Sequence, residues 1–199
     1  MAVLFKGKKW SVTRPANELD KFVLSFARFL EAQGTRYVLV SGYVSILFGR
    51  SRNSEDVDVF IEPLDRQRFK EFWRAALEEY DSVTVSDADD AFDNYLSAGL
   101  SLRLARKGRI LPNMELKFPK DGLADWSLEH SVDADLNGGN LKIAPLELQI
   151  PYKLYLGSEK DVEDALHLWH VCRDNLDLGV LNGFVALLKQ GEAARKWLK

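Results

Sequence analysis

The sequence is poor in the residues that cross-link small secreted proteins. It has one cysteine among 199 residues, so an intramolecular disulfide is excluded and a reducing compartment is expected. We expect this residue, Cys172, to be a small buried hydrophobic side chain on a helix rather than a nucleophile. The chain therefore has to fold on its apolar core alone, and its hydrophobic content of 46% is sufficient for that.

Long apolar runs are also missing. No stretch reaches the roughly 20 residues that a transmembrane helix needs. The basic residues Lys6, Lys8 and Lys9 near the N-terminus are not followed by the apolar core of a signal peptide. We therefore expect a cytoplasmic protein with no membrane partner.

Neither sign of charge dominates, because 27 basic and 30 acidic side chains give a formal charge of -3. This excludes a global positive field that attracts nucleic acid, but not a local basic patch. The best such patch is the loop 106–109, which either steers a polyanionic acceptor such as tRNA or is a solvated hairpin tip. Walker, metalloprotease and Ser-His-Asp patterns do not occur. The spacing of His167 and His170 indicates a helix face rather than a transition-metal site.

The pattern of apolar residues predicts a mixed α/β protein, of one domain with elaborations or of two small domains. The expected helices span residues 17–33, 42–48, 64–80, 159–172 and 178–189, and the expected strands 36–40, 57–62, 100–105 and 114–118, with a hairpin at 132–143. From Pro145 onward the chain is expected to be helical, and Pro151 either bends the first helix there or marks its start. We therefore divide the chain into an α/β part, residues 1–144, and a helical part packed on it, residues 145–199.

Two aspartates spaced one residue apart are the most informative feature. Asp56 and Asp58 lie on a predicted strand, so their side chains point to the same face. Neighbouring carboxylates repel each other unless a cation lies between them, and Mg²⁺ takes one or two carboxylates together with substrate phosphate oxygens. The same alternation is found in any half-exposed strand, so the pair alone leaves both interpretations open.

The segment before the aspartates supplies groups that can bind phosphate. Ser41 and Gly42 lie where a predicted strand turns into a helix, and backbone N–H groups at such a helix start are unpaired. Arg52 and Ser54 add a cation and a hydroxyl group. The alternatives are a simple turn at Ser41 and a polar loop in which Ser54 bonds to the nearby backbone.

Together these residues resemble the signature of the polymerase-beta-like nucleotidyltransferase superfamily. In its small members a strand is followed by Gly-Gly or Gly-Ser, a short helix and Gly-x-x-Arg-x-Ser/Thr-x-Asp-hydrophobic-Asp. The matching positions here are Ser41, Gly42, Gly49, Arg52, Ser54, Asp56 and Asp58, and Ser41 departs from the usual first glycine. Downstream, residues 143–154 and 160–166 are similar to the helical segment of nucleotidyltransferases of the abortive-infection toxin type and of their uncharacterised relatives.

The resemblance implies a nucleotidyltransferase fold, in which helices flank a short mixed β-sheet and a helical part follows. It implies the Mg²⁺- or Mn²⁺-dependent transfer of a nucleoside monophosphate from an NTP to a hydroxyl acceptor, with release of pyrophosphate. The acceptor is an RNA end such as that of tRNA, a protein, or a small molecule such as an aminoglycoside, and a toxin–antitoxin partner is a further candidate. The alternatives are a catalytically inactive binding or antitoxin-type module of the same fold, and a hydrolytic site.

The resemblance also implies roles for the motif residues. Asp56 and Asp58 would hold the metal ion. The phosphates of the NTP would lie against Ser41 and Gly42, and the side chains of Arg52 and Ser54 would complete that binding site.

The resemblance also implies roles for residues outside the motif. Glu115 is the candidate for a third carboxylate, which shares the metal or accepts the proton of the attacking hydroxyl. Its alternative is a surface glutamate paired with Lys117. Lys153 would reach the phosphates, or is a helix lysine whose stem lies over apolar surface. Asp161 and Asp164 would orient this lysine or support the packing of the helices.

Overall fold

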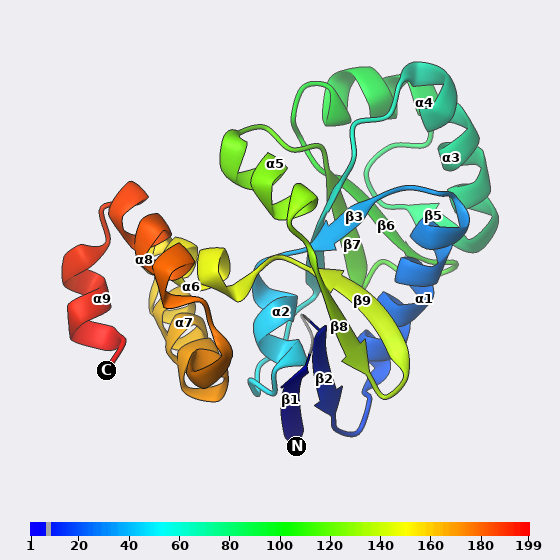
Figure 1. Cartoon of the computed structure of the whole chain (residues 1–199). Coiled ribbons are helices and arrows are strands. Elements are labelled where there is room, and N and C mark those ends of the chain that lie inside the picture. The colour runs from blue at the N-terminus through cyan, green and yellow to red at the C-terminus, as the bar shows by residue number, and fades with distance from the viewer. Residues whose placement is uncertain (7–8) are drawn as a thin grey trace.

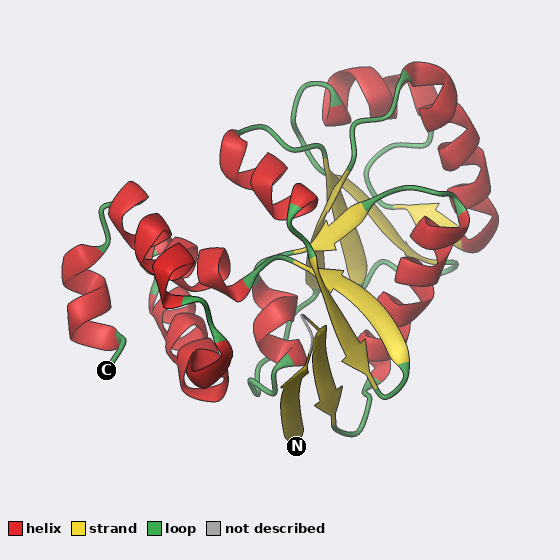
Figure 2. Ribbon diagram, viewed as in Figure 1, coloured by secondary structure: helices red, strands yellow, loops and turns green. Residues whose placement is uncertain are grey.

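A computed structural model describes residues 1–6 and 9–199. Its strands form one mixed sheet in the order β1-β2-β8-β9-β3-β4-β7-β6-β5, with helices packed around it (Figure 1 and Figure 2). The expected mixed α/β class is therefore confirmed. The strands are β1 (Ala2–Lys6), β2 (Lys9–Thr13), β3 (Tyr37–Leu39), β4 (Asp56–Ile61), β5 (Tyr80–Ser82), β6 (Leu102–Arg106), β7 (Asn113–Lys117), β8 (Val132–Leu136) and β9 (Gly139–Ile143).

The helices occur in two groups along the chain. Those that alternate with strands are α1 (Glu18–Ala32), α2 (Gly42–Leu47), α3 (Arg66–Glu79), α4 (Ala88–Asp90) and α5 (Gly122–Glu129), with a π-helical turn at Ala91–Leu96 after α4. Those that follow the last strand are α6 (Leu146–Leu156), α7 (Glu159–Cys172), α8 (Leu178–Leu187) and α9 (Gly191–Trp197), with a 3₁₀ turn at Arg173–Asn175. Figure 1 shows this second group gathered at the side of the sheet away from α3 and α4.

Strand β4 separates two environments because its side chains alternate between the faces of the sheet. Its odd-numbered residues are fully buried in the main core, which α1 and α3 also line. Asp56, Asp58 and Phe60 point to the opposite face. There Phe60 packs against a small cluster that includes Leu128 of α5. The carboxylates thus stand on the side of the sheet that α5 covers.

Several boundaries differ from the sequence expectations. Helix α7 spans the expected residues 159–172. Helix α6 begins at Leu146 and continues through Pro151, so this proline does not mark its start. The helix expected from residue 64 begins after Asp65, whose carboxylate caps it by accepting from the Arg68 N–H. The hairpin of β1 and β2 and the helix α5 were not expected at all.

The part of the chain that the structure describes contains no helix with the length and apolar character to cross a bilayer. The division into residues 1–144 and 145–199 stays a prediction. Ion pairs join the two parts, since Arg50 contacts both Glu163 and Asp164 of α7.

Candidate functional site

The predicted carboxylates lie side by side on two parallel strands. In the register of β4 and β7, Asp58 stands opposite Glu115 and Asp56 stands opposite Asn113. Parallel neighbours are about 4.8 Å apart, so the side chains of each pair meet on the same face. This arrangement brings the motif of β4 together with a carboxylate 57 positions later in the chain, from Asp58 to Glu115.

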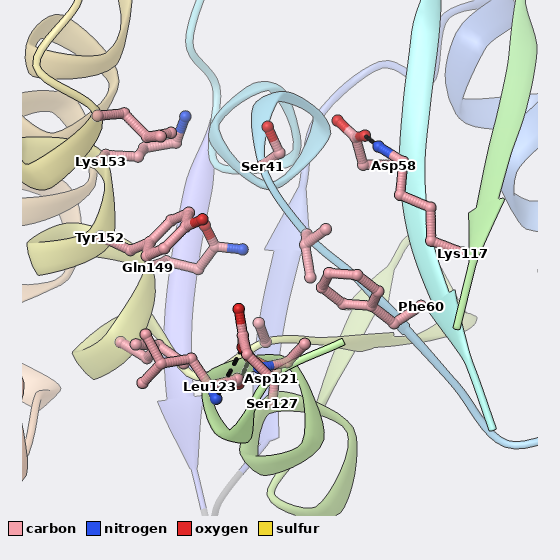
Figure 3. Close-up of a pocket in the computed structure, with 15 residues that line it drawn as sticks. Ser41, Asp58, Phe60, Lys117, Asp121, Leu123, Ser127, Gln149, Tyr152 and Lys153 are labelled. Atoms are coloured by element: carbon pink, nitrogen blue, oxygen red, sulfur yellow. Dashed lines mark hydrogen bonds and ion pairs between the residues drawn. The ribbon is translucent and has the colours of Figure 1, made fainter. Parts of the chain in front are cut away.

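A lysine connects the two opposed carboxylates. The Lys117 Nζ donates to Asp58 Oδ1 at 2.7 Å (Figure 3). The same Nζ lies 2.9 Å from Glu115 Oε2. Burial favours the neutral amine, but the charges and hydrogen bonds of Asp58 and Glu115 outweigh it and raise the pKa of Lys117. The lysine is therefore a fixed cation between two anions.

Glu115 is held from its other side by β6. The Arg103 Nε donates to Glu115 Oε1 at 2.7 Å, because these residues are directly opposed in the antiparallel pair of β6 and β7. Burial opposes the charge of Glu115, but the hydrogen bonds from Lys117 and Arg103 prevail and lower its pKa. Glu115 is only 8% exposed, so it is not a surface residue as the alternative interpretation expected. The pairing with Lys117, which that interpretation also expected, is present.

Asp56 has a neutral partner. The Asn113 Nδ2 donates to Asp56 Oδ1 at 2.6 Å, and Asn113 is almost completely buried. The Ser54 hydroxyl donates to the backbone oxygen of Asp56 at 2.8 Å, which is the local backbone bond named above as the alternative for this residue. Asn113 was not singled out from the sequence, and the only signal for it is a polar residue at the start of an apolar strand.

The turn from β3 into α2 has an unusual backbone. Ser41 adopts φ 61° and ψ −131°, a conformation that glycine reaches at far lower cost. At Gly42 an added Cβ would lie 1.9 Å from Nη2 of Arg52, so the glycine leaves the space that the guanidinium group occupies in this conformation. The serine thus adopts a backbone conformation that favours glycine, the residue usual at this place in the signature.

Lys153 is the centre of a buried ion network. It is 1% exposed, and its Nζ donates to Asp164 Oδ2 at 2.8 Å and to Asp161 Oδ1 at 3.4 Å. Asp164 also accepts from Arg50 Nε at 3.0 Å and lies 3.3 Å from Arg52 Nη1. The alternative of a lysine stem lying over apolar surface is wrong, because the ammonium group itself is buried. Asp161 and Asp164 do orient this lysine.

A cavity of about 210 Å³ lies between β3, β4, α5 and α6. Its polar lining comes from Ser41, Asp58, Lys117, Asp121, Ser127, Gln149 and Lys153, and its apolar lining includes Phe60, Leu123, Leu148, Tyr152 and Leu156. In Figure 3 the side chains of Ser41, Asp58 and Lys153 gather at one end, and those of α5 lie at the other. The amide group of Gln149 points into the space between them. The cavity therefore has one end with Asp58 and Lys153 and another end that is mainly apolar apart from Asp121 and Ser127.

The structure unites some predicted site residues more closely than others. Three of them, Ser41, Asp58 and Lys153, line the cavity. Asp56 and Glu115 flank Asp58 on the sheet. Gly42, Arg52 and Ser54 lie in the adjoining turn and loop. There the Arg52 guanidinium lies beside Gly42 and close to Asp164, and the Ser54 hydroxyl donates to the backbone of Asp56.

The carboxylates suit a hard divalent cation, which prefers oxygen ligands. The Lys117 ammonium occupies the position that a metal ion shared by Asp58 and Glu115 would have, and it shows that these two carboxylates accommodate a positive charge. Within residues 1–6 and 9–199, no three or more His, Cys, Asp or Glu side chains are grouped so as to hold a metal ion. The fit is thus to an ion that takes one or two carboxylates here and completes its shell from substrate and water.

Solved structures with the same arrangement of elements identify the fold. The chain is similar to an antigenic nucleotidyltransferase-like protein from Paracoccidioides brasiliensis, with a TM-score of 0.55 and 18% identity over 91% of this chain and 92% of that one. It is also similar to the antibiotic-resistance factor ANT(2'')-Ia, with a TM-score of 0.52 and 10% identity over 90% and 97% of the two chains. This is a nucleotidyltransferase fold. No protein-family model matches the sequence, and no curated protein matches it either.

Within the nucleotidyltransferase fold, the residues of the predicted motif lie together where β3 ends and β4 begins. Asp56 and Asp58 occupy the first half of β4, and the Ser41–Gly42 turn lies at the end of the neighbouring strand β3. Because β3 and β4 are antiparallel, the end of one strand meets the start of the other. The expected assembly of turn and carboxylates thus follows directly from the topology.

Proposed function

We propose that this protein transfers a nucleoside monophosphate from an NTP to a hydroxyl acceptor and releases pyrophosphate. The observation that carries the proposal is the cavity in which Ser41, Asp58 and Lys153 meet, beside the carboxylates of β4 and β7. Asp56 and Asp58 would hold a Mg²⁺ or Mn²⁺ ion there. When bound, such an ion neutralises charge on the phosphates and polarises the oxygen atoms that it contacts.

The other residues of the chain would bind and orient the triphosphate. Arg52 supports this role, because its Nε atom is buried without a hydrogen-bond acceptor among the described residues, while its Nη1 atom lies 3.3 Å from Asp164 Oδ2. A phosphate oxygen beside the Ser41–Gly42 turn would supply that acceptor. Lys117 and Lys153 would add positive charge at the same end of the cavity. Charge-assisted bonds of this kind position the α-phosphorus for in-line attack.

The apolar end of the cavity would receive the nucleoside. Tyr152 and Phe60 offer aromatic surface for a planar base, and the Gln149 amide offers both a donor and an acceptor to its polar edge. The acceptor then remains a choice among an RNA end, a protein and a small molecule. A small-molecule acceptor such as an aminoglycoside is among those that the sequence resemblance implies, and ANT(2'')-Ia, to which the fold is similar, is an antibiotic-resistance factor. A toxin–antitoxin partner rests on the sequence resemblance alone, whereas a location in the cytoplasm is proposed from the single cysteine and the lack of a long apolar run in the sequence.

A specific contact also supports a second candidate, a nucleotide-binding module without catalysis. Lys117 and Arg103 already neutralise much of the charge of the carboxylates, and this weakens the attraction for a metal ion. Such a protein would bind NTP in the same cavity but transfer nothing.

The test is incubation of the protein with each NTP labelled at the α-phosphate, with Mg²⁺ or Mn²⁺, and with total RNA, protein and small-molecule acceptors. We expect labelled product and pyrophosphate from the wild type and at least a hundredfold slower transfer by Asp58→Asn. The matched control is Asp133→Asn. Asp133 lies on β8, its carboxylate is 2.8 Å from Lys142 Nζ, and it does not line the cavity. NTP binding without any transfer would favour the binding module, and release of phosphate in place of pyrophosphate would indicate hydrolysis.

A further inference from the structure

Lys117 stands where a cation shared by Asp58 and Glu115 has to stand. Its Nζ lies 2.7 Å from one carboxylate and 2.9 Å from the other, across the junction of β4 and β7. We propose that the Lys117 ammonium takes the place of a second divalent cation, so that the site binds one such ion and not two. This inference rests on the function proposed above and concerns which groups supply positive charge to the carboxylates of the same site.

Two positive ions cannot occupy this position together. A divalent ion bridging Asp58 and Glu115 would need oxygen atoms at 2.0–2.6 Å, within the space that the ammonium group fills. Lys117 is anchored by both carboxylates and by the strand register, and its side chain is only 30% exposed. A metal ion would have to break both contacts and face the displaced positive charge a few ångströms away. The lysine is therefore the resident cation of this position.

The charge of the cluster agrees with a single further ion. Asp56, Asp58 and Glu115 carry three negative charges, and Arg103 and Lys117 carry two positive ones. One net negative charge remains, which suffices to attract one divalent ion with its phosphates. Without Lys117 and Arg103 the same three carboxylates would favour two ions.

The oxygen atoms that remain lie on the two aspartates. Asn113 binds Oδ1 of Asp56, and Lys117 binds Oδ1 of Asp58. In the described part of the chain the Oδ2 atoms of these aspartates have no such donor. They are the ligands that the structure leaves for one ion, while Glu115 serves as the anchor of Lys117. Lys117 also lines the cavity, so its ammonium is placed to contact a substrate oxygen.

The experiment counts Mn²⁺ ions per bound nucleotide by electron paramagnetic resonance, with an NTP analogue that cannot be cleaved between the α- and β-phosphates. We expect one ion per bound nucleotide in the wild type and two in Lys117→Met, in which the position is vacated. Manganese anomalous scattering from crystals of the same complexes would place the additional ion between Asp58 and Glu115.

Two further variants control the count. Lys142→Met removes a lysine that contacts Asp133 on another strand pair, and it should bind one ion. Lys117→Arg keeps the charge, and it should also bind one ion even if Lys117→Met does not fold. Two ions in the wild type would overturn the inference and leave the proposed function standing. One ion in a folded Lys117→Met would overturn it as well. No nucleotide and no ion in the wild type would overturn the proposed function itself.

Discussion

A serine at position 41 has a backbone conformation that suits glycine. Its φ of 61° with ψ of −131° belongs to a region that is costly for any residue with a Cβ, of the order of 1–3 kcal/mol. Ser41 nevertheless lines the cavity, where its hydroxyl is available to a ligand. The serine therefore combines a functional group with a strained backbone.

We expect Ser41→Gly to raise the free energy of unfolding by about 1 kcal/mol, since relief of strain exceeds the larger chain entropy of unfolded glycine. Urea denaturation measures this change. The control is Ser97→Gly, at an exposed position with an ordinary φ of −69°, which should lower stability by about 0.5 kcal/mol. Equal effects of the two substitutions would mean that Ser41 is not strained.

The sequence predicted the site residues that belong to a recognisable motif, but not those whose role depends on contacts between distant strands. The signature placed Ser41 and Asp58 in one site, the downstream helical resemblance added Lys153, and the structure brings all three to one cavity. Asn113 and the bridging role of Lys117 depend on the register of β4 and β7, and no local pattern fixes which residues of two distant strands face each other. Contacts between strands were therefore the part of the site that the sequence could not supply.

At the scale of elements, one carboxylate of α7 fixes the loop that leads into β4. Asp164 is fully buried and accepts from Arg50 and Lys153, with Arg52 at 3.3 Å. A buried carboxylate with such partners costs much to remove, because the partners are left with uncompensated charge. The conformation of the loop before Asp56 and Asp58 thus depends on a helix.

We expect Asp164→Asn to lower the free energy of unfolding by about 3 kcal/mol, measured by urea denaturation at neutral pH. The matched control is Glu163→Gln, the adjacent residue, whose half-exposed carboxylate also contacts Arg50 and should change stability by less than about 0.5 kcal/mol. Adding Lys153→Met to Asp164→Asn removes one orphaned charge and should recover part of the loss. Similar costs for Asp164→Asn and Glu163→Gln would contradict this account.

The elements were predicted best where their signals are local. Helix α7 has a serine cap, an acidic first turn and an amphipathic repeat, and its bounds match the expected 159–172. Strand β1 is a short edge strand in which four of the five residues are apolar, so its sequence lacks the alternation of polar and apolar residues that marks a half-exposed strand. Helix α5 has only eight residues and a weakly amphipathic sequence, so its periodicity does not stand out. Both become recognisable only through what they pack against.

At the scale of the whole molecule, burial of groups that ionise at high pH affects stability. Burial raises the pKa of Cys172 from 9.0 to about 12, and it also raises the pKa of Tyr37 and of Tyr43, the latter with help from nearby Asp20. These groups stay protonated in the folded protein at pH values where they lose a proton in the unfolded chain. The folded state therefore becomes less favourable as the pH rises.

We expect the free energy of unfolding to be constant with respect to Cys172 below pH 9 and to fall by up to about 1.4 kcal/mol per pH unit for this group between about pH 9 and 12. Urea denaturation at about pH 8, 9.5 and 11 measures the slope. Cys172→Ala should be less stable at every pH because of the cavity it creates, but its slope should be smaller by the share of one group. Parallel pH profiles for the two proteins would show that the thiol is not the cause.

Asp164 and Arg50 are 114 residues apart in the chain and directly bonded in space. Any attempt to graft a foreign helical region onto this sheet would remove the counter-charge that Asp164 provides to Arg50 and Arg52. A chimera that keeps the aspartates of β4 but exchanges residues 145–199 must therefore import an acidic residue at the same place, or replace both arginines as well. No exchange of the helical region at residue 145 therefore leaves the stability of the protein unaffected.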